Sequence, residues 1–208
     1  MTEYSQRNWN SIAAMAGRTE VRPDGFAADN PAVNMEQPHL DLEILPVQEA
    51  DIAALVEMFL LVERQHERYW PLRWALRTDV QDRYTRWITS NRSHPDWLFV
   101  VARHKSDRAE DTFSDEVIGG LAAAINQEIP IYQFTHYAFI HDLAVRADVR
   151  RHGVGRALIE YARKWAGEKG VNQLRLMAAE SNDPAKALFD KCGFRTTYNE
   201  MVLPINPP

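Results

Sequence analysis

The feature that most constrains this chain is a glycine-containing turn between a predicted strand and a predicted helix. An apolar strand ends at Val145, a short basic segment follows, and Gly153 and Gly155 open an amphipathic helix that extends to Glu168. The first N–H groups of a helix have no partners within it, and the helix dipole makes this end partly positive. Glycines let a phosphate approach such N–H groups without meeting a Cβ. The turn therefore predicts an anion-binding site.

The segment around this turn is basic, although the whole chain is acidic. Residues 146–156 contain four arginines and one aspartate, whereas the 208 residues together carry a net charge of −5. The overall charge argues against nucleic acid or an anionic membrane as the main partner, because both favour a basic surface. The turn lacks the G-K-S/T of a Walker A loop, and Leu158 stands where a dinucleotide fingerprint requires glycine or alanine.

Strand-like and helical patterns follow one another through a single domain. We expect residues 1–37 to form a flexible N-terminal extension and residues 38–208 to form the domain. Strands are expected at 40–44, 97–102, 117–125, 134–145, 174–178 and 196–203. Helices are expected through 52–59, from a capping box at 78–81 to 88, at 153–168 and at 183–191. This order predicts an α/β or α+β domain with one central sheet.

The cysteine content and the hydropathy pattern favour a cytoplasmic protein. Cys192 is the single cysteine, which excludes an internal disulfide and a cysteine-based zinc site. No apolar run approaches the ~18 residues that a membrane span requires. The first ten residues lack the pattern of a signal peptide. We expect no metal, and a monomer or a homodimer.

Two motifs in sequence order resemble those of the GNAT N-acetyltransferase family. Arg150-x-x-Gly153-x-Gly155 is similar to the acetyl-CoA-binding motif of that family. Downstream, the pattern N-x-x-A-x-x-L-F-x-x-x-G-F from Asn182 to Phe194 resembles the family's last helix and the turn after it. The resemblance covers about residues 40–203 and is strongest over 139–194. It implies a mixed, mostly antiparallel sheet, flanked by helices, whose strands part near Val145 and Ala178 to admit acetyl-CoA.

The resemblance also assigns groups to the acetyl donor. It implies that pantetheine pairs with the backbone before the turn, that the pyrophosphate binds the N–H groups of residues 151–156, and that Arg150 or Arg151 reaches the 3′-phosphate. A side chain at Gly153 or Gly155 is expected to obstruct the phosphate. The implied cofactor-binding residues are Leu143, Ala144, Val145, Arg150, Arg151, His152, Gly153, Val154, Gly155, Arg156 and Asn182.

Direct transfer of the acetyl group to a primary amine requires a base and a donor to the developing oxyanion. His141 and Asp142 are the candidate bases, and His141 is similar in position to a histidine of the arylalkylamine acetyltransferases. Because adjacent strand residues face opposite sides, we expect them not to face one substrate together. Alternatively, His141 is a satisfied interior histidine and Asp142 a loop anchor. The resemblance places the oxyanion donor at the N–H of Leu143 or Ala144.

The group that protonates the departing thiolate is left open by the sequence. The family commonly has a tyrosine where this chain has Phe189. Either Tyr198, Tyr132 or Tyr137 replaces it, or the thiolate leaves unassisted, which a thiol pKa near ~8.5 tolerates. A further alternative is that the chain only binds CoA, as a non-catalytic CoA-sensing or partner-binding module.

The acceptor-binding candidates lie in the first half of the chain and in the hairpin that follows it. His66, Tyr69, Trp70 and Trp74 either stack on a ring or cation of the acceptor or form the core of two short helices. Glu128 either helps to bind the acceptor or is simply exposed. The acceptor is an amine whose identity the sequence does not define.

Overall fold

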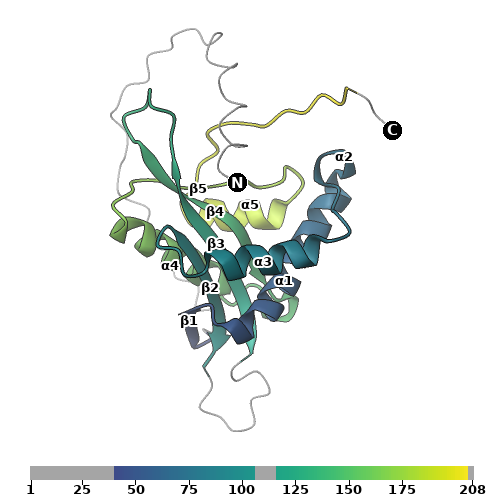
Figure 1. The fold of residues 1–208 in the computed structure, drawn as a ribbon, viewed down its shortest axis with the longest axis vertical. Helices are drawn as coiled ribbons and strands as arrows, with labels where there is room; N and C mark the ends of the chain where they lie inside the picture. Colours follow the sequence, from purple (N-terminus) through teal and green to yellow (C-terminus); the bar gives the residue numbers. More distant parts are fainter. Residues whose placement is uncertain (1–39, 106–115, 206–208) are drawn as a thin grey trace. The chain divides into compact units, whose positions relative to one another are not determined.

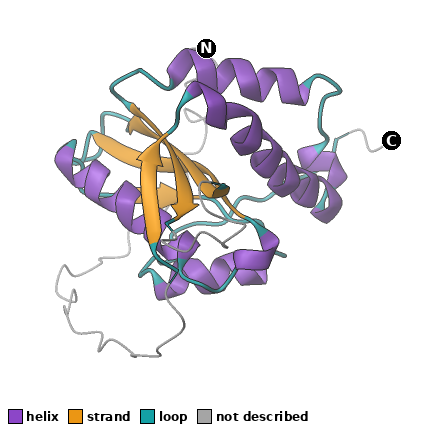
Figure 2. Ribbon diagram, turned by 90° about the horizontal axis from the view of Figure 1, so that it is seen from below, coloured by secondary structure: helices purple, strands orange, loops and turns teal. Residues whose placement is uncertain are grey.

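The computed structural model of the chain describes residues 40–105 and 116–205. The predicted extension, residues 1–37, lies outside the described residues. Within them, a central sheet carries helices on both faces (Figure 2). The predicted α/β class and single central sheet are therefore confirmed. In these two ranges no helix has the length and apolarity that a membrane span requires.

The sheet has five strands in the order β1-β2-β3-β4-β5 (Figure 1). The strands are β1 (Leu42–Pro46), β2 (Trp97–His104), β3 (Val117–Gln127), β4 (His136–Val145) and β5 (Leu174–Leu176). Neighbours from β1 to β4 are antiparallel, whereas β5 runs parallel to β4. The sheet is thus mixed and mostly antiparallel, as the family resemblance implies.

Two hydrophobic clusters hold the helices against the sheet. The helices are η1 (Glu49–Asp51), α1 (Ile52–Tyr69), α2 (Pro71–Trp74), α3 (Val80–Asn91), η2 (Ala147–Val149), α4 (Val154–Glu168) and α5 (Asp183–Lys191). On one face, Phe59 of α1 and Ile88 of α3 are fully buried with Ala122 of β3. On the other face, Leu158 of α4 is fully buried with Leu121 of β3. These clusters fix α1 and α3 on one side of β4 and α4 on the other.

The pairing between β4 and β5 is short and ends where β4 continues. Register partners extend only from Ala138 and Leu174 to Ile140 and Leu176. Beyond that point β4 runs on to Val145, and no strand of residues 40–105 and 116–205 pairs with it on its β5 side. The second half of β4 is therefore open on this side among the described residues, as the predicted opening requires.

Two local expectations are wrong. Residues 196–203 form no strand. The expected capping box at 78–81 is not formed either, because α3 begins at Val80 with Asp79 as its N-cap residue. The Asp79 carboxylate makes no capping bond, since it accepts hydrogen bonds from Arg77 and Arg83 instead.

Candidate functional site

The glycine turn presents unpaired backbone donors at the start of α4. Arg151 and Gly153 have φ angles of 69° and 87°, in the left-handed region that side chains disfavour. The carbonyl of Gly153 accepts the first hydrogen bond of the helix, 2.9 Å from the nitrogen of Ala157. The N–H groups of residues 154–156 therefore have no partner within α4 and lie at the positive end of its dipole. This arrangement fits a pyrophosphate.

Gly153 and Gly155 each require glycine, but for different structural reasons. A Cβ built on Gly153 meets nothing within 4 Å, so its requirement for glycine comes from its positive φ. A Cβ built on Gly155 would instead lie 2.9 Å from Cδ2 of Leu188 in α5. Gly155 therefore has a packing reason to be glycine, because this position faces the α4–α5 contact, and the expected obstruction of the phosphate there stays a prediction.

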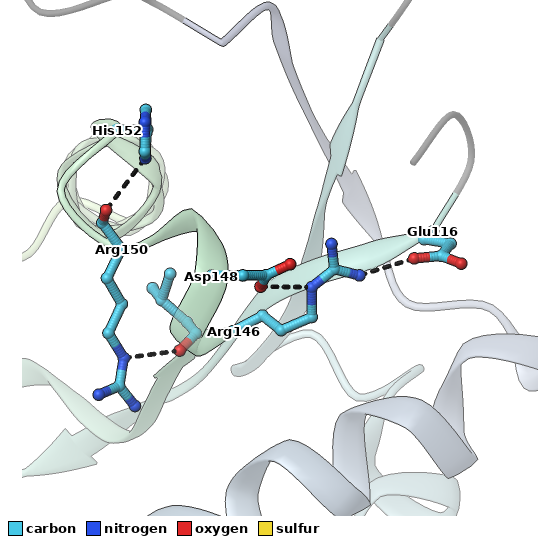
Figure 3. A network of polar contacts seen from close by, with 6 residues as sticks. Glu116, Arg146, Asp148, Arg150 and His152 are labelled. Carbon is cyan, nitrogen blue, oxygen red and sulfur yellow. Dashed lines mark hydrogen bonds and ion pairs between the residues drawn. The ribbon is translucent and has the colours of Figure 1, made fainter. Parts of the chain in front are cut away.

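The arginines around the turn divide into one structural residue and three exposed ones. Arg146 lies between Glu116 and Asp148, at 2.6 and 2.8 Å, and thereby ties the end of β4 to the start of β3 (Figure 3). Arg150 donates from Nε to the carbonyl of Val145 at 3.2 Å. Its exposed guanidinium, with those of Arg151 and Arg156, can face a phosphate. His152 is held by its Nδ1, 3.0 Å from the Arg150 carbonyl.

The peptide groups at the end of β4 alternate between β3 and the gap. The N–H of Arg146 donates to the carbonyl of Ile118 in β3 at 3.0 Å. In an antiparallel pair every second residue points the same way, so Ala144 also faces β3. The peptide groups of Leu143 and Val145 then face the gap beside β5. Of the expected backbone contacts, those of Leu143 and Val145 fit this geometry, whereas the N–H of Ala144 points away.

A β-bulge brings His141 and Asp142 to the same side of the sheet. Register partners pass from Ala122–Asp142 directly to Ala123–Ile140, which leaves His141 as the extra residue of β4. The Asp142 carboxylate contacts Tyr84 of α3, and the His141 ring contacts Trp87 of the same helix. The expectation that these neighbours face opposite sides is wrong, because the bulge interrupts the alternation of the strand.

Asp142 is a buried carboxylate with a single hydrogen-bond partner among the described side chains. Its exposed fraction is 6%, and its Oδ1 accepts a hydrogen bond from the Tyr84 hydroxyl at 3.1 Å. Burial and the nearby Glu63 carboxylate raise its pKa from 3.8 to about 7, against the opposing effect of the Tyr84 hydrogen bond. Asp142 can therefore accept a proton near neutral pH.

His141 lies among aromatic rings. Its imidazole stacks on Trp97 with a centroid distance of 5.2 Å and meets Trp87 and Phe139 edge-on at 6.0 and 5.1 Å. Although the residue as a whole is exposed, the protein atoms packed around the ring desolvate it and lower the pKa of the imidazole. At neutral pH His141 is a neutral hydrogen-bonding group in an aromatic wall and a weak base.

Three of the four expected acceptor-binding residues of the helical region lie together. His66 and Tyr69 belong to the last turns of α1, and the His66 ring lies 6.4 Å from that of Tyr69 and 5.5 Å from that of Trp74. The Arg73 guanidinium lies over the Trp74 ring, 4.0 Å from its centroid. Trp70 is exposed, and among the described rings it makes no contact with this group.

Glu128 lies in the β3–β4 hairpin, directly after the end of β3. Its carboxylate accepts hydrogen bonds from Arg175 of β5 at 2.5 Å and from the N–H of Ile129 at 3.0 Å. Burial acts to raise its pKa, but these two bonds hold it below its usual value. The Arg175 guanidinium also lies over the Tyr137 ring, 3.9 Å from its centroid. Glu128 thus ties the β3–β4 hairpin to β5, away from the residues of α1 and α2.

The remaining candidates lie along the β5 side of the gap. Asn182 caps α5, where its Oδ1 accepts from the N–H of Ala185 at 3.4 Å, so only its amide nitrogen is left to donate. Tyr198 is 56% exposed, and its hydroxyl lies 3.7 Å from the sulfur of Met177, which follows β5. Phe189 packs edge-on against Phe194 at 5.8 Å.

Sequence reasoning missed two residues that act on Asp142: Tyr84, which donates a hydrogen bond to it, and Glu63, whose charge raises its pKa. Glu63 follows Phe59 by four residues and so continues the buried stripe of α1. Tyr84 shares the inner face of α3 with Ile88. The sequence did contain one signal, because Glu63 places a carboxylate within the apolar stripe of α1. The pattern of one helix does not reveal that this carboxylate meets residues of α3 and β4.

The comparisons with known proteins agree with this architecture. A model of the acetyltransferase (GNAT) family matches residues 57–194. Streptothricin acetyltransferase of Escherichia coli is 33% identical over 99 residues, which cover 45% of this chain and 57% of the relative. N-acetyltransferase family 8 member 3 of Rattus norvegicus is 25% identical over 146 residues, 70% of this chain and 57% of the relative. The matches thus span little more than half the length of these relatives.

A solved structure shares the fold at low sequence identity. The aminoglycoside 6′-N-acetyltransferase AAC(6′)-Ih from Acinetobacter baumannii superposes with a TM-score of 0.59 and 20% identity, over 80% of this chain and 99% of that one. Within residues 40–105 and 116–205, no group of three or more His, Cys, Asp or Glu side chains is arranged to hold a metal ion.

Proposed function

Because the chain belongs to the acetyltransferase (GNAT) family, we propose that it transfers an acetyl group from acetyl-CoA directly to a primary amine in a ternary complex. The acceptor is a small molecule or a peptide. One observation carries the proposal: β4 continues beyond its pairing with β5 to Val145, whose Cγ2 lies 3.7 Å from a Cβ built on Gly155 in the first turn of α4. The family uses acetyl-CoA as its acetyl donor, and this juxtaposition supplies a place for both its arm and its phosphates.

The chain binds the donor through backbone and charge. The N–H groups of residues 154–156 hold the pyrophosphate, and the guanidinium of Arg150 or Arg151 holds the 3′-phosphate. The peptide groups of Leu143 and Val145 pair with the pantetheine arm. The N–H of Leu143 also donates to the thioester oxygen as negative charge develops there.

Asp142 is the base that the geometry favours. A general base works best when its pKa lies near the operating pH, and the carboxyl of Asp142, with a pKa of about 7, meets this condition. The imidazole of His141 is a weaker base because burial lowers its pKa. We assign His141, with Trp87 and Trp97, to the wall of the acceptor site.

Of the tyrosines expected for the departing thiolate, Tyr198 lies beside Met177, the residue that follows β5. Phe189 carries no hydroxyl, and the Tyr198 hydroxyl beside Met177 is the proton donor that the geometry favours. If Tyr198 is replaced by phenylalanine, a loss of turnover with unchanged CoA affinity supports this role. Unchanged turnover excludes Tyr198 and leaves Tyr132, Tyr137 or unassisted departure of the thiolate.

The proposal is tested by CoA release from acetyl-CoA in the presence of a panel of amines. Streptothricin comes first, because the Escherichia coli relative is named for it, followed by aminoglycosides, polyamines, amino acids and peptide N-termini. We expect turnover with at least one amine, and a strong loss in Asp142→Asn at unchanged CoA affinity. Turnover at the wild-type rate in this variant contradicts the role of Asp142.

Phe189 favours a second candidate, a CoA-sensing or partner-binding module without catalysis. The same assay separates the two functions. Tight CoA binding without turnover for any amine supports the module, whereas amine-dependent CoA release excludes it.

A further inference from the structure

A group of four polar side chains lies between α1, α3 and the bulged strand β4. We call Glu63, His66, Tyr84 and Asp142 the acid–tyrosine cluster. Tyr84 joins it to β4 through the hydrogen bond to Asp142 Oδ1 at 3.1 Å. His66 lies at its other end, with Nδ1 3.5 Å from Oε1 of Glu63. The cluster therefore links the candidate base to the end of α1.

The Tyr84 phenol is hydrogen-bonded to one carboxylate of the cluster, that of Asp142, and the charge of the other, Glu63, acts on both groups. Burial raises the pKa of the Tyr84 hydroxyl, and the charges and hydrogen bonds of Asp142 and Glu63 add to this effect. A hydroxyl has a single proton to donate, so Tyr84 can satisfy only one carboxylate at a time. Among residues 40–105 and 116–205, neither Asp142 nor Glu63 forms an ion pair with a lysine or an arginine. No fixed cation therefore compensates the two carboxylates there.

The groups that face Asp142 come from each neighbouring element. Glu63 and His66 face it from α1, Tyr84 from α3, and His141 adjoins it in the bulge of β4. The partner of Asp142 on β3 is Ala122, which carries no charge. The ionisation of Asp142 is thus governed by its burial first, and then by Glu63, by the Tyr84 hydroxyl and by His66.

We propose that Tyr84 is a positioning residue whose hydroxyl donates to Asp142 while that carboxylate is ionised, and turns to Glu63 when Asp142 takes the proton of the acceptor. This inference rests on the proposed acetyl transfer to an amine. An N–H bond of the acceptor ammonium breaks, its electron pair stays on nitrogen, and an O–H bond forms on Asp142. The new O–H donates to the oxygen of Tyr84, and the phenol proton then points to Glu63.

The consequence is a change of hydrogen-bond direction without a second proton transfer. The amine gains the lone pair with which it attacks the thioester, and the charge of the cluster falls from two carboxylates to one. Glu63 accepts the hydrogen bond that Asp142 no longer needs. Tyr84 thus makes both protonation states of the base acceptable in a buried site.

The test is an NMR titration of ¹³C-labelled side-chain carboxyls in the full chain, without donor or acceptor. In Tyr84→Phe, the ionised Asp142 loses its donor, and we expect its pKa to rise by about one unit. In Glu63→Gln, a like charge is removed, and we expect the pKa of Asp142 to fall. Tyr161→Phe, on the opposite face of the sheet in α4, is the control that should leave this pKa unchanged.

The signal of Glu63 tests the change of direction itself. We expect the Glu63 carboxyl to show a step at the titration midpoint of Asp142 in the wild type, and to lose it in Tyr84→Phe. A step of equal size in both proteins, or an Asp142 pKa that Tyr84→Phe leaves unchanged, overturns the inference. If Tyr84→Phe does not fold, an Asp142 pKa that does not fall in Glu63→Gln overturns it.

Kinetics then connect the cluster to turnover. The limb of the kcat profile that rises with pH should move to higher pH in Tyr84→Phe and to lower pH in Glu63→Gln. A loss of stability without these opposite shifts means a structural role for Tyr84 and overturns the inference. Absence of CoA release for every amine defeats the proposed function instead. The titration is read without substrates, so the two failures are distinguishable.

Discussion

Gly155 in the first turn of α4 faces Leu188 of α5 so closely that a Cβ on the glycine would lie 2.9 Å from Cδ2 of the leucine. Gly155 is buried, and Leu188 packs against the cluster that α4 forms with the sheet. The contact therefore couples the two helices that carry the two motifs of the sequence. It also separates the structural role of Gly155 from the conformational role of Gly153.

We expect Gly155→Val to lower the free energy of unfolding by about 1–3 kcal/mol, because the new side chain must displace Leu188. Gly167→Ala is the matched control in the same helix, since a Cβ there meets nothing within 4 Å. It should raise stability by about 0.5–1 kcal/mol through helix propensity. Urea denaturation of the three proteins measures both values. Equal stability of Gly155→Val and the wild type would contradict the assigned contact.

Gly153→Ala should weaken CoA binding at a stability cost of about 1–2 kcal/mol, because alanine disfavours the φ of 87°. Gly170 provides a close control, with a φ of 73° and no atom within 4 Å of an added Cβ. Gly170→Ala should lose similar stability and keep its CoA affinity. Calorimetric titration with CoA compares the two variants. Equal affinities for CoA would show that Gly153 does not shape the phosphate site.

Arg151→Gln should reduce the affinity for CoA more than that for 3′-dephospho-CoA, if its exposed guanidinium contacts the 3′-phosphate. Arg150→Gln tests the other candidate in the same way. The control is Arg163→Gln, because Arg163 lies farther along α4 and pairs with Glu160 at its surface. An equal loss of affinity for CoA and 3′-dephospho-CoA would show that the arginine does not contact the 3′-phosphate.

Asp142→Asn should remove a pH dependence of stability. The native carboxyl has a pKa of about 7 against 3.8 for an ordinary aspartate, so the native state binds more protons than the unfolded state between these values. Stability therefore falls as the pH rises from about 4 to about 7, by about 2–4 kcal/mol. The asparagine variant should lack this fall. Denaturation at several pH values checks it, and a parallel slope in both proteins would argue against a raised pKa.

Periodic patterns predicted the helices best, because a buried helix face leaves its mark within one segment. The bounds of α5, Asp183–Lys191, and the start of α4 beside Gly153 agree with the sequence predictions. The strand expected at 196–203 is absent because a strand, unlike a helix, needs a partner from elsewhere in the chain. The alternation of apolar residues does not say whether the edge of a neighbouring strand is available.

The site was predicted in part. The glycine turn, the strand before it and Asp142 follow from the sequence, because motif spacing fixes them relative to one another. The bulge at His141 does not, since an extra residue in one strand is defined only by its pairing with another. Glu63 and Tyr84 could not be predicted as neighbours of Asp142, because they lie on α1 and α3, and strands β2 and β3 come between these helices and β4 in the sequence.

Because β5 pairs with β4 over only three residues, β5 and α5 should unfold locally and separately from the rest of the sheet. All of β5 is only half-buried, and α5 contains no fully buried residue. Such segments open before the rest of a domain does, so their amide hydrogens should exchange with solvent faster than those of β2 and β3. A ligand that bridges the gap would join β5 and α5 to the rest of the sheet and slow that exchange. If the donor binds at this open edge as proposed, it stabilises this part of the molecule most.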